Sequence, residues 1–131
     1  MNNDTHEIQD VLDRYATALR TADASLAASV YAESGVFYPY NLPTATGPDE
    51  LLTSYSAIFN TIKLDVAFTV HEIVVDGELA FATTTSSGTV TVLADQSSSA
   101  EHNREVFVFV RTNGEWKIGR YMFNKATAPG A

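Results

Sequence analysis

The segment that most constrains the fold of this 131-residue chain is residues 104–124, REVFVFVRTNGEWKIGRYMFN. Two stretches with alternating apolar residues flank Asn113-Gly114, and that dipeptide in such a setting is the strongest short signal for a β-hairpin. The second stretch contains the only Trp of the chain, Trp116. We therefore expect the chain to close with an antiparallel pair of strands against which the rest of the sequence packs.

The N-terminal half predicts three helices. Asp4 and Glu7 have the spacing of a capping box, and apolar residues then recur with helical period as far as Leu19. Asp23 is a suitable N-cap for a second, shorter helix, and Thr46-Gly47-Pro48 is a typical start for a third, which extends to residue 62.

From Leu64 onward the apolar residues alternate, which predicts strands. The first of these turns at Asp76-Gly77 into a strand over 78–93, the polar, Ser-rich residues 94–103 are expected to form a mobile loop, and the C-terminal hairpin follows. Together with a short strand over 36–38, the pattern predicts one α+β domain over residues 1–131. We expect its helices to pack on one face of a curved antiparallel sheet.

Composition excludes several classes of function. The net charge is −8 and no basic cluster is present, so nucleic acid and anionic membranes are poor partners. The chain contains no Cys, which rules out disulfides, thiolate nucleophiles and Cys-ligated metals. Its three His are dispersed and no Gly-rich dinucleotide loop is present, so we expect neither a metal nor a cofactor. The polar residues 1–10 and the lack of a long apolar run predict a cytoplasmic protein.

Glu105 is the first candidate for acid–base chemistry. With a period of two, it shares a strand face with Phe107 and Phe109. A carboxyl group in an apolar setting has a raised pKa, which suits proton transfer near neutral pH. The alternative is that Glu105 pairs with an arginine on the sheet surface, and the sequence leaves both interpretations open.

Aromatic residues and one Asn are candidates for a pocket that binds a small apolar or aromatic substrate. They are Tyr38, Tyr40, Asn41, Tyr55, Phe59, Phe68, Phe107 and Tyr121. The alternative is that most of these side chains belong to a packed core.

The predicted element order resembles that of the NTF2-like (SnoaL-like) superfamily over essentially the whole chain. Local matches lie in residues 14–19, 31–47 and 114–124. Residues 103–108 and 120–124 are most similar to the small NTF2-like proteins that accompany enediyne polyketide synthases. The resemblance implies a cone-shaped sheet around a central pocket and a homodimer formed through the sheet. It also implies a polyketide synthase as a possible partner.

The resemblance also suggests roles for three further residues. Tyr15 matches the tyrosine of ketosteroid isomerases that donates a hydrogen bond to an oxyanion. Asn124 stands where SnoaL-type cyclases have an Asp, and its amide can orient a carbonyl but cannot act as a base. Arg120 would hold a carboxylate or enolate, or else neutralise a neighbouring glutamate. Residues 37–40 lack the carboxylate base of ketosteroid isomerases, which argues against that family mechanism.

These observations predict a cofactor-independent enzyme of secondary metabolism, an isomerase, cyclase or dehydratase that acts on a polyketide or polyene intermediate. Glu105 would move the proton, while Tyr15, Asn124 and Arg120 would stabilise an enolate or an oriented carbonyl. The first alternative is a non-catalytic protein that binds an intermediate for a synthase. The second is a protein–protein module that uses the sheet face bearing Val106, Val108 and Val110.

Overall fold

The computed structural model describes residues 3–127. Its helices are α1 (Asp4–Thr21), α2 (Ala24–Ser29) and α3 (Gly47–Thr61). Its strands are β1 (Tyr31–Tyr38), β2 (Ala45–Thr46), β3 (Ile62–Asp76), β4 (Leu79–Val92), β5 (Ser97–Thr112) and β6 (Glu115–Lys125). The predicted order of elements is confirmed, with the two-residue strand β2 as an addition.

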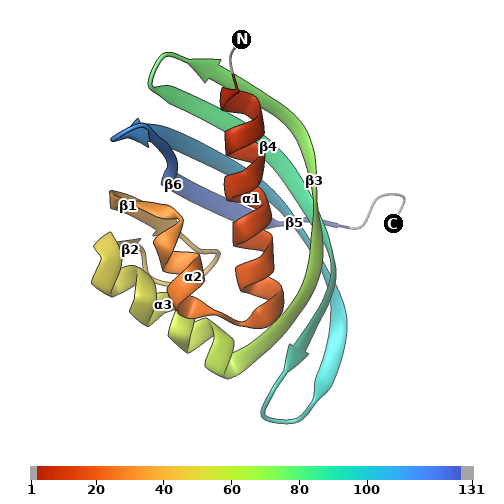
Figure 1. Cartoon of the computed structure of the whole chain (residues 1–131). Helices are drawn as coiled ribbons and strands as arrows, with labels where there is room; N and C mark the ends of the chain where they lie inside the picture. The colour runs from red at the N-terminus through yellow and green to blue at the C-terminus, as the bar shows by residue number, and fades with distance from the viewer. Residues whose placement is uncertain (1–2, 128–131) are drawn as a thin grey trace.

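The strands form one six-stranded sheet in the order β2-β1-β6-β5-β4-β3. Every neighbouring pair is antiparallel except β1 and β6, which run parallel, so the sheet is mixed rather than wholly antiparallel. The long strands β3, β4 and β5 curve around α1, and α2 and α3 lie beside the lower half of that helix (Figure 1). The α+β cone predicted from the sequence is confirmed.

Helix α1 packs its apolar face against the concave side of the sheet. The buried side chains of that face are Ile8, Val11, Leu12, Tyr15 and Leu19. Full burial of one such side chain stabilises the fold by about 1.5–3 kcal/mol, so this face anchors the helix. Of the helices within residues 3–127, none is long and apolar enough to cross a lipid bilayer.

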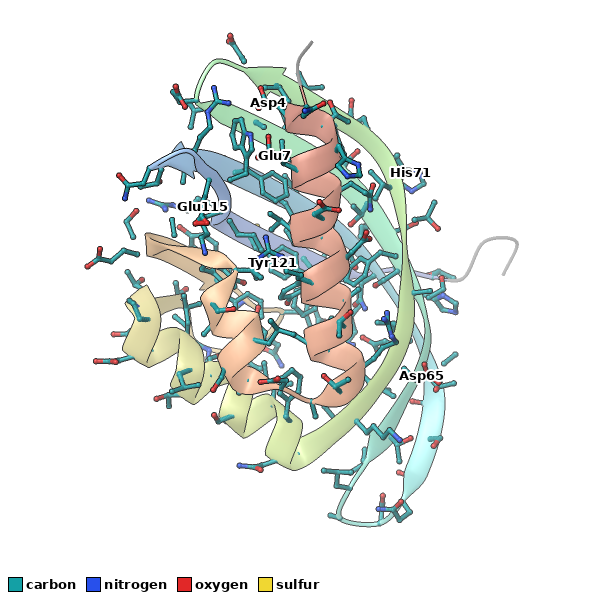
Figure 2. All side chains as sticks on the ribbon, viewed as in Figure 1. Asp4, Glu7, Asp65, His71, Glu115 and Tyr121 are labelled. Atoms are coloured by element: carbon teal, nitrogen blue, oxygen red, sulfur yellow. The ribbon has the colours of Figure 1, made fainter. Side chains whose placement is uncertain are left out.

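The first turn of α1 is fixed by tertiary contacts rather than by the predicted capping box. Asn3 occupies the N-cap position and makes no side-chain cap bond. Asp4 lies at the start of α1 (Figure 2), and its Oδ1 instead accepts hydrogen bonds from Arg111 Nη1 at 2.8 Å and from Trp116 Nε1 at 3.0 Å. The buried carboxylate thus has two donors from the C-terminal hairpin, the guanidinium of Arg111 and the indole N–H of Trp116. Hydrogen bonds from a charged donor are stronger than those from the neutral backbone N–H groups of a capping box. Asp4 therefore joins the two ends of the domain.

The prediction of a mobile loop over residues 94–103 is wrong. Strand β5 begins at Ser97, and its first residues pair with the end of β4, Val92 opposite Ser97. The side chains of Thr91 and Ser98 also share a hydrogen bond of 2.8 Å across the pair. The hairpin therefore extends far beyond the apolar core, held by its backbone ladder and by polar cross-strand pairs.

A β-bulge in β6 decides which residues of the last strand face inward. Val108 pairs with Arg120 and Phe109 with Ile118, so Gly119 is the extra residue. Because of this insertion, Ile118 and Tyr121 are both buried although they are an odd number of residues apart. The bulge thus turns Tyr121 toward the helices, and it turns Arg120 toward the outer face.

Candidate functional site

A cavity of about 710 Å³ lies between the concave face of the sheet and helices α1 and α3. Its volume is in the range of small-molecule pockets. Most of the wall is apolar or aromatic, including Leu19, Phe37, Ile58, Leu64, Phe68, Tyr121 and Phe123. Tyr121 projects from β6 into the space between sheet and helices (Figure 2). Tyr40, Asp49 and Glu50 are exposed and form part of the rim.

Glu105 is a buried carboxyl group in this wall, with only 3 % of the residue exposed. Thr84 Oγ1 donates to its Oε1 and Ser86 Oγ to its Oε2, each at 2.5 Å. Both donors come from β4, whose register places Thr84 directly opposite Glu105. Burial raises the pKa of Glu105 above its ordinary value. The two hydroxyl donors offset part of this rise, and the negative charge of Glu101 adds to it.

The predicted alternative, an arginine partner for Glu105, is not what the structure contains. Arg104 Nε donates to Asn124 Oδ1, and Arg111 is bound by Asp4 and Glu78. Arg120 Nη1 donates to the backbone carbonyl oxygens of Ser34 and Gly119. The charge of Glu105 is therefore met by hydroxyl groups rather than by a cation.

Three tyrosine hydroxyls form a chain that ends in the cavity wall. The hydroxyl oxygen of Tyr55 lies 2.7 Å from that of Tyr15 and 2.6 Å from that of Tyr31. Three hydroxyls carry three protons, and the two bonds between them use two, so one proton is left for an outside acceptor. Tyr15 lines the cavity and Tyr31 does not.

Burial keeps these tyrosines in the neutral form. It raises the pKa of Tyr15 well above its ordinary value, and the negative charge of Glu105 adds to the rise, while the bond from Tyr55 opposes it. Burial also raises the pKa values of Tyr31, Tyr55 and Tyr121. Tyr15 is accordingly a neutral hydroxyl, and it donates into the cavity when the chain runs from Tyr31 through Tyr55 to Tyr15.

A second polar cluster occupies the same wall, further along β5 toward its N-terminal end. Lys125 Nζ lies 2.9 Å from Glu101 Oε1 and 2.7 Å from Oε2. Asn103 Nδ2 donates to Glu101 Oε2 at 2.9 Å and, more weakly, to Ser86 Oγ at 3.3 Å. Because Ser86 accepts from Asn103, its own proton is directed to Glu105. A continuous chain of hydrogen bonds therefore links Lys125 to Glu105.

The structure brings half of the predicted site residues to the cavity. Those in its wall are Tyr15, Tyr40, Tyr55, Phe68, Glu105 and Tyr121. The other six are outside the wall: Tyr38, Asn41, Phe59, Phe107, Arg120 and Asn124. Phe107 and Phe59 are buried in the core, and Phe107 stacks on the ring of Tyr121 with centroids 4.1 Å apart. Asn41 is exposed, in the left-handed backbone region with φ of 57°.

The expectation that Arg120 and Asn124 reach the pocket is wrong on geometry. Tyr121 and Phe123 face inward, so the residues that alternate with them face outward. The amide of Asn124 is bound to Arg104, and the guanidinium of Arg120 binds backbone carbonyls. Neither side chain is placed to contact a ligand in the cavity.

Sequence reasoning missed the polar cluster of Ser86, Glu101, Asn103 and Lys125, and also Phe37 and Tyr31. Glu101 and Asn103 are an even number of residues from Glu105, so they lie on the same face of β5. Lys125 lies on the same face of β6 as Tyr121 for the same reason. Period-two counting from Glu105 would have found the first two, had residues 94–103 been recognised as strand. Across residues 3–127, no group of three or more His, Asp or Glu side chains is arranged to hold a metal ion.

Comparisons with known proteins agree with this architecture. A ketosteroid isomerase-like protein from Erwinia carotovora atroseptica has a TM-score of 0.92 at 28 % identity, covering 97 % of this chain and 99 % of the other. A candidate dehydratase of the NTF2-like family from Streptomyces avermitilis has a TM-score of 0.79 at 18 % identity, covering 96 % and 98 %. A Nostoc punctiforme protein with a cystatin-like fold has a TM-score of 0.76 at 17 % identity, covering 98 % and 95 %.

No protein with a curated function matches the chain. The family model of the SnoaL-like domain matches residues 2–122, which is nearly the whole sequence. With the fold and the cavity described above, this match shows that the chain belongs to the SnoaL-like family of the NTF2-like superfamily.

Proposed function

We propose that this protein is a cofactor-independent acid–base enzyme and that Glu105 carries the proton. One observation supports this above all others: a carboxyl group only 3 % exposed stands in the wall of an apolar cavity of about 710 Å³, and its pKa is raised by burial. A group whose pKa approaches the working pH both accepts and returns a proton efficiently. Such a group suits isomerisation, cyclisation or dehydration.

Tyr15 supplies the second component of the proposed chemistry. Removal of a proton from the carbon beside a carbonyl group leaves negative charge on the carbonyl oxygen. The Tyr15 hydroxyl, with its chain to Tyr55 and Tyr31, is a neutral donor in the same cavity as Glu105. In the proposed reaction, Glu105 takes the proton, Tyr15 stabilises the enolate oxygen, and Glu105 returns the proton to another carbon or to a leaving oxygen.

The proposed substrate is a polyketide or polyene intermediate. The apolar and aromatic cavity wall suits a flat or extended carbon skeleton. The resemblance of residues 103–108 and 120–124 to proteins that accompany enediyne polyketide synthases supports the same class. The similarity to a ketosteroid isomerase-like protein is consistent with proton transfer next to a carbonyl.

A non-catalytic role in binding an intermediate for a synthase is the second candidate. One observation favours it: both oxygens of Glu105 already accept hydrogen bonds from Thr84 and Ser86. In that account the carboxylate is a structural acceptor that fixes β4 against β5, and the cavity only holds the ligand.

Replacement of Glu105 by Gln in the producing organism separates the two accounts. The acid–base account predicts loss of the final product or accumulation of an intermediate, while the protein level stays normal. Glu115→Gln is the matched control, because it removes the same charge from an exposed residue outside the cavity. An unchanged product profile in the Glu105→Gln strain, with the protein present, would refute proton transfer and favour the binding role.

We also propose that the protein pairs through the outer face of its sheet. Val106 and Met122 are cross-strand neighbours there, and each is at least half exposed, 50 % and 55 %. Phe81, which is exposed, and Val108, which is half-buried, form the next apolar pair on the same face. Exposed apolar side chains that adjoin one another are typical of an interface.

A further inference from the structure

The charged groups of the cavity wall limit which ligands it accepts. The described wall contains four carboxyl groups, those of Asp49, Glu50, Glu101 and Glu105. Lys125 is the one basic residue among the described wall residues. A bound anion would therefore enter a space with an excess of negative charge.

Lys125 is not available to neutralise such an anion. Its Nζ contacts both oxygens of Glu101, at 2.9 and 2.7 Å, and the Glu101 side chain is only 9 % exposed. If Lys125 turned to a ligand, the buried carboxylate of Glu101 would lose its cation and keep only the amide of Asn103. The Lys125 side chain is half exposed, but the Glu101 side chain is not, so loss of the cation would leave a nearly buried charge without its ion-pair partner, which is unfavourable. The ion pair therefore removes Lys125 as an anion-binding group.

Arg120, which the sequence suggested as a group that holds a carboxylate or enolate, is outside the cavity wall. Arg120 points to the outer face, where it binds the carbonyl oxygens of Ser34 and Gly119. The remaining contacts that the wall offers are rings, methyl groups, hydroxyls and the amide of Asn103. These groups solvate a neutral carbonyl or hydroxyl well, and they do not compensate a full negative charge.

We infer that the cavity binds its ligand in an uncharged form and excludes carboxylates, phosphates and sulfonates. For the proposed function this means that the substrate is a neutral ketone, lactone or polyene rather than a free polyketide acid. The inference shares one assumption with the proposed function, namely that the substrate binds in this cavity. It does not require that Glu105 transfers a proton.

A matched pair of ligands tests this exclusion directly. Naphthalene-2-carboxamide and naphthalene-2-carboxylate have nearly the same shape and differ by one negative charge at pH 7. Isothermal titration calorimetry with the full chain gives both affinities without any turnover. We expect the carboxylate to bind roughly tenfold more weakly than the amide, or worse, because the wall holds four carboxyl groups and its single described basic residue is already paired with one of them.

Glu101→Gln should reverse much of this preference. The substitution leaves Asn103 Nδ2 with an acceptor and frees Lys125 from its ion pair, so we expect the ratio of carboxylate affinity to amide affinity to rise severalfold. Glu115→Gln removes the same charge on the surface, and it should leave the ratio of the two affinities unchanged.

Two results would overturn the inference. One is a wild-type protein that binds the carboxylate as tightly as the amide. The other is that neither compound binds. The wild-type comparison needs no variant, so it stands even if Glu101→Gln does not fold. The two proposals fail in different experiments. If Glu105 carries no proton, the product profile of the Glu105→Gln strain stays normal, whereas the ratio of the two wild-type affinities is unaffected.

Discussion

Tyr55→Phe is the substitution for which the structure gives the clearest magnitude. The Tyr55 hydroxyl is the centre of the chain, bonded to Tyr15 at 2.7 Å and to Tyr31 at 2.6 Å, and all three residues are buried. Its ring stacks on Phe37 with centroids 4.8 Å apart, a contact that Phe retains. The substitution therefore removes two hydrogen bonds and changes the packing little.

The expected loss follows from these two bonds. Each buried hydrogen bond contributes about 1 kcal/mol net, and a hydroxyl left without its partner adds about 1–3 kcal/mol. We expect the free energy of unfolding to fall by about 2–4 kcal/mol, a large share of the roughly 5–15 kcal/mol typical of a domain. Tyr15 also loses the strongest of the hydrogen bonds that oppose the rise in its pKa, so it becomes a weaker donor to a ligand.

Urea unfolding measures this loss. Trp116 is the only Trp of the chain and is buried, so its fluorescence follows the transition. Tyr40→Phe is the control, because Tyr40 is 48 % exposed at the rim, and it should change stability by less than about 0.5 kcal/mol. The account of the hydroxyl chain would be refuted if Tyr55→Phe cost no more than this control at equal protein concentration.

Four further predictions follow from single features of the structure. Because burial raises the pKa of Glu105, its ionisation opposes folding: its contribution to stability is complete at low pH and is lost as pH rises through the folded-state pKa. The stability of Glu105→Gln minus that of wild type should thus grow from pH 4 to pH 8 in urea titrations, and a constant difference would contradict this. Gly88→Ala should cost about 1–3 kcal/mol by thermal unfolding, since its Cβ would overlap the backbone of Asp65 on β3, and a neutral result would refute the close approach. Asp4→Ala should cost about 2 kcal/mol or more in the same assay, because the buried indole N–H of Trp116 loses its acceptor, whereas Asp10→Ala on the exposed face should be near neutral. Val106→Lys should convert the proposed dimer to a monomer in sedimentation velocity, and a monomeric wild type at micromolar concentration would disprove the dimer.

Much of the fold can be predicted from the sequence because the patterns that specify it are local. The apolar stripe of α1 follows from the helical period, and the Asn113-Gly114 turn follows from the backbone angles that a tight hairpin needs. In the structure both turn residues have positive φ, 52° and 79°, as a tight hairpin turn of this kind needs. Asp23 likewise caps α2, accepting a hydrogen bond from the Leu26 backbone N–H at 3.0 Å.

The site is harder to predict because a polar cavity wall hides the signal of a strand. In β5 the inward residues Glu101 and Asn103 are polar, so the alternation that identifies Phe107 and Phe109 is absent at its beginning. The segment therefore resembles a loop. In β6 the bulge at Gly119 changes the parity, and no local pattern in the sequence reveals a single inserted residue.

Once one inward-facing residue of a strand is known, the alternation of side chains predicts which of its neighbours beyond any bulge also face inward. If Tyr121 faces the cavity, then Lys125 must do so and Asn124 must not, which the structure confirms. The parallel pairing of β1 with β6 is different in kind. It joins residues more than eighty positions apart, and no local pattern specifies it.

The protonation state of Glu105 is the most direct test of the central claim. Carbon-13 NMR of protein labelled at the glutamate side-chain carboxyl carbons follows each titration, and Glu105→Gln assigns the signal by its disappearance. We predict that the Glu105 carboxyl titrates at higher pH than an ordinary glutamate, and that Ser86→Ala raises its pKa further by removing a donor to the charged form. A Glu105 signal that titrates at or below the ordinary range would contradict its role as the proton carrier.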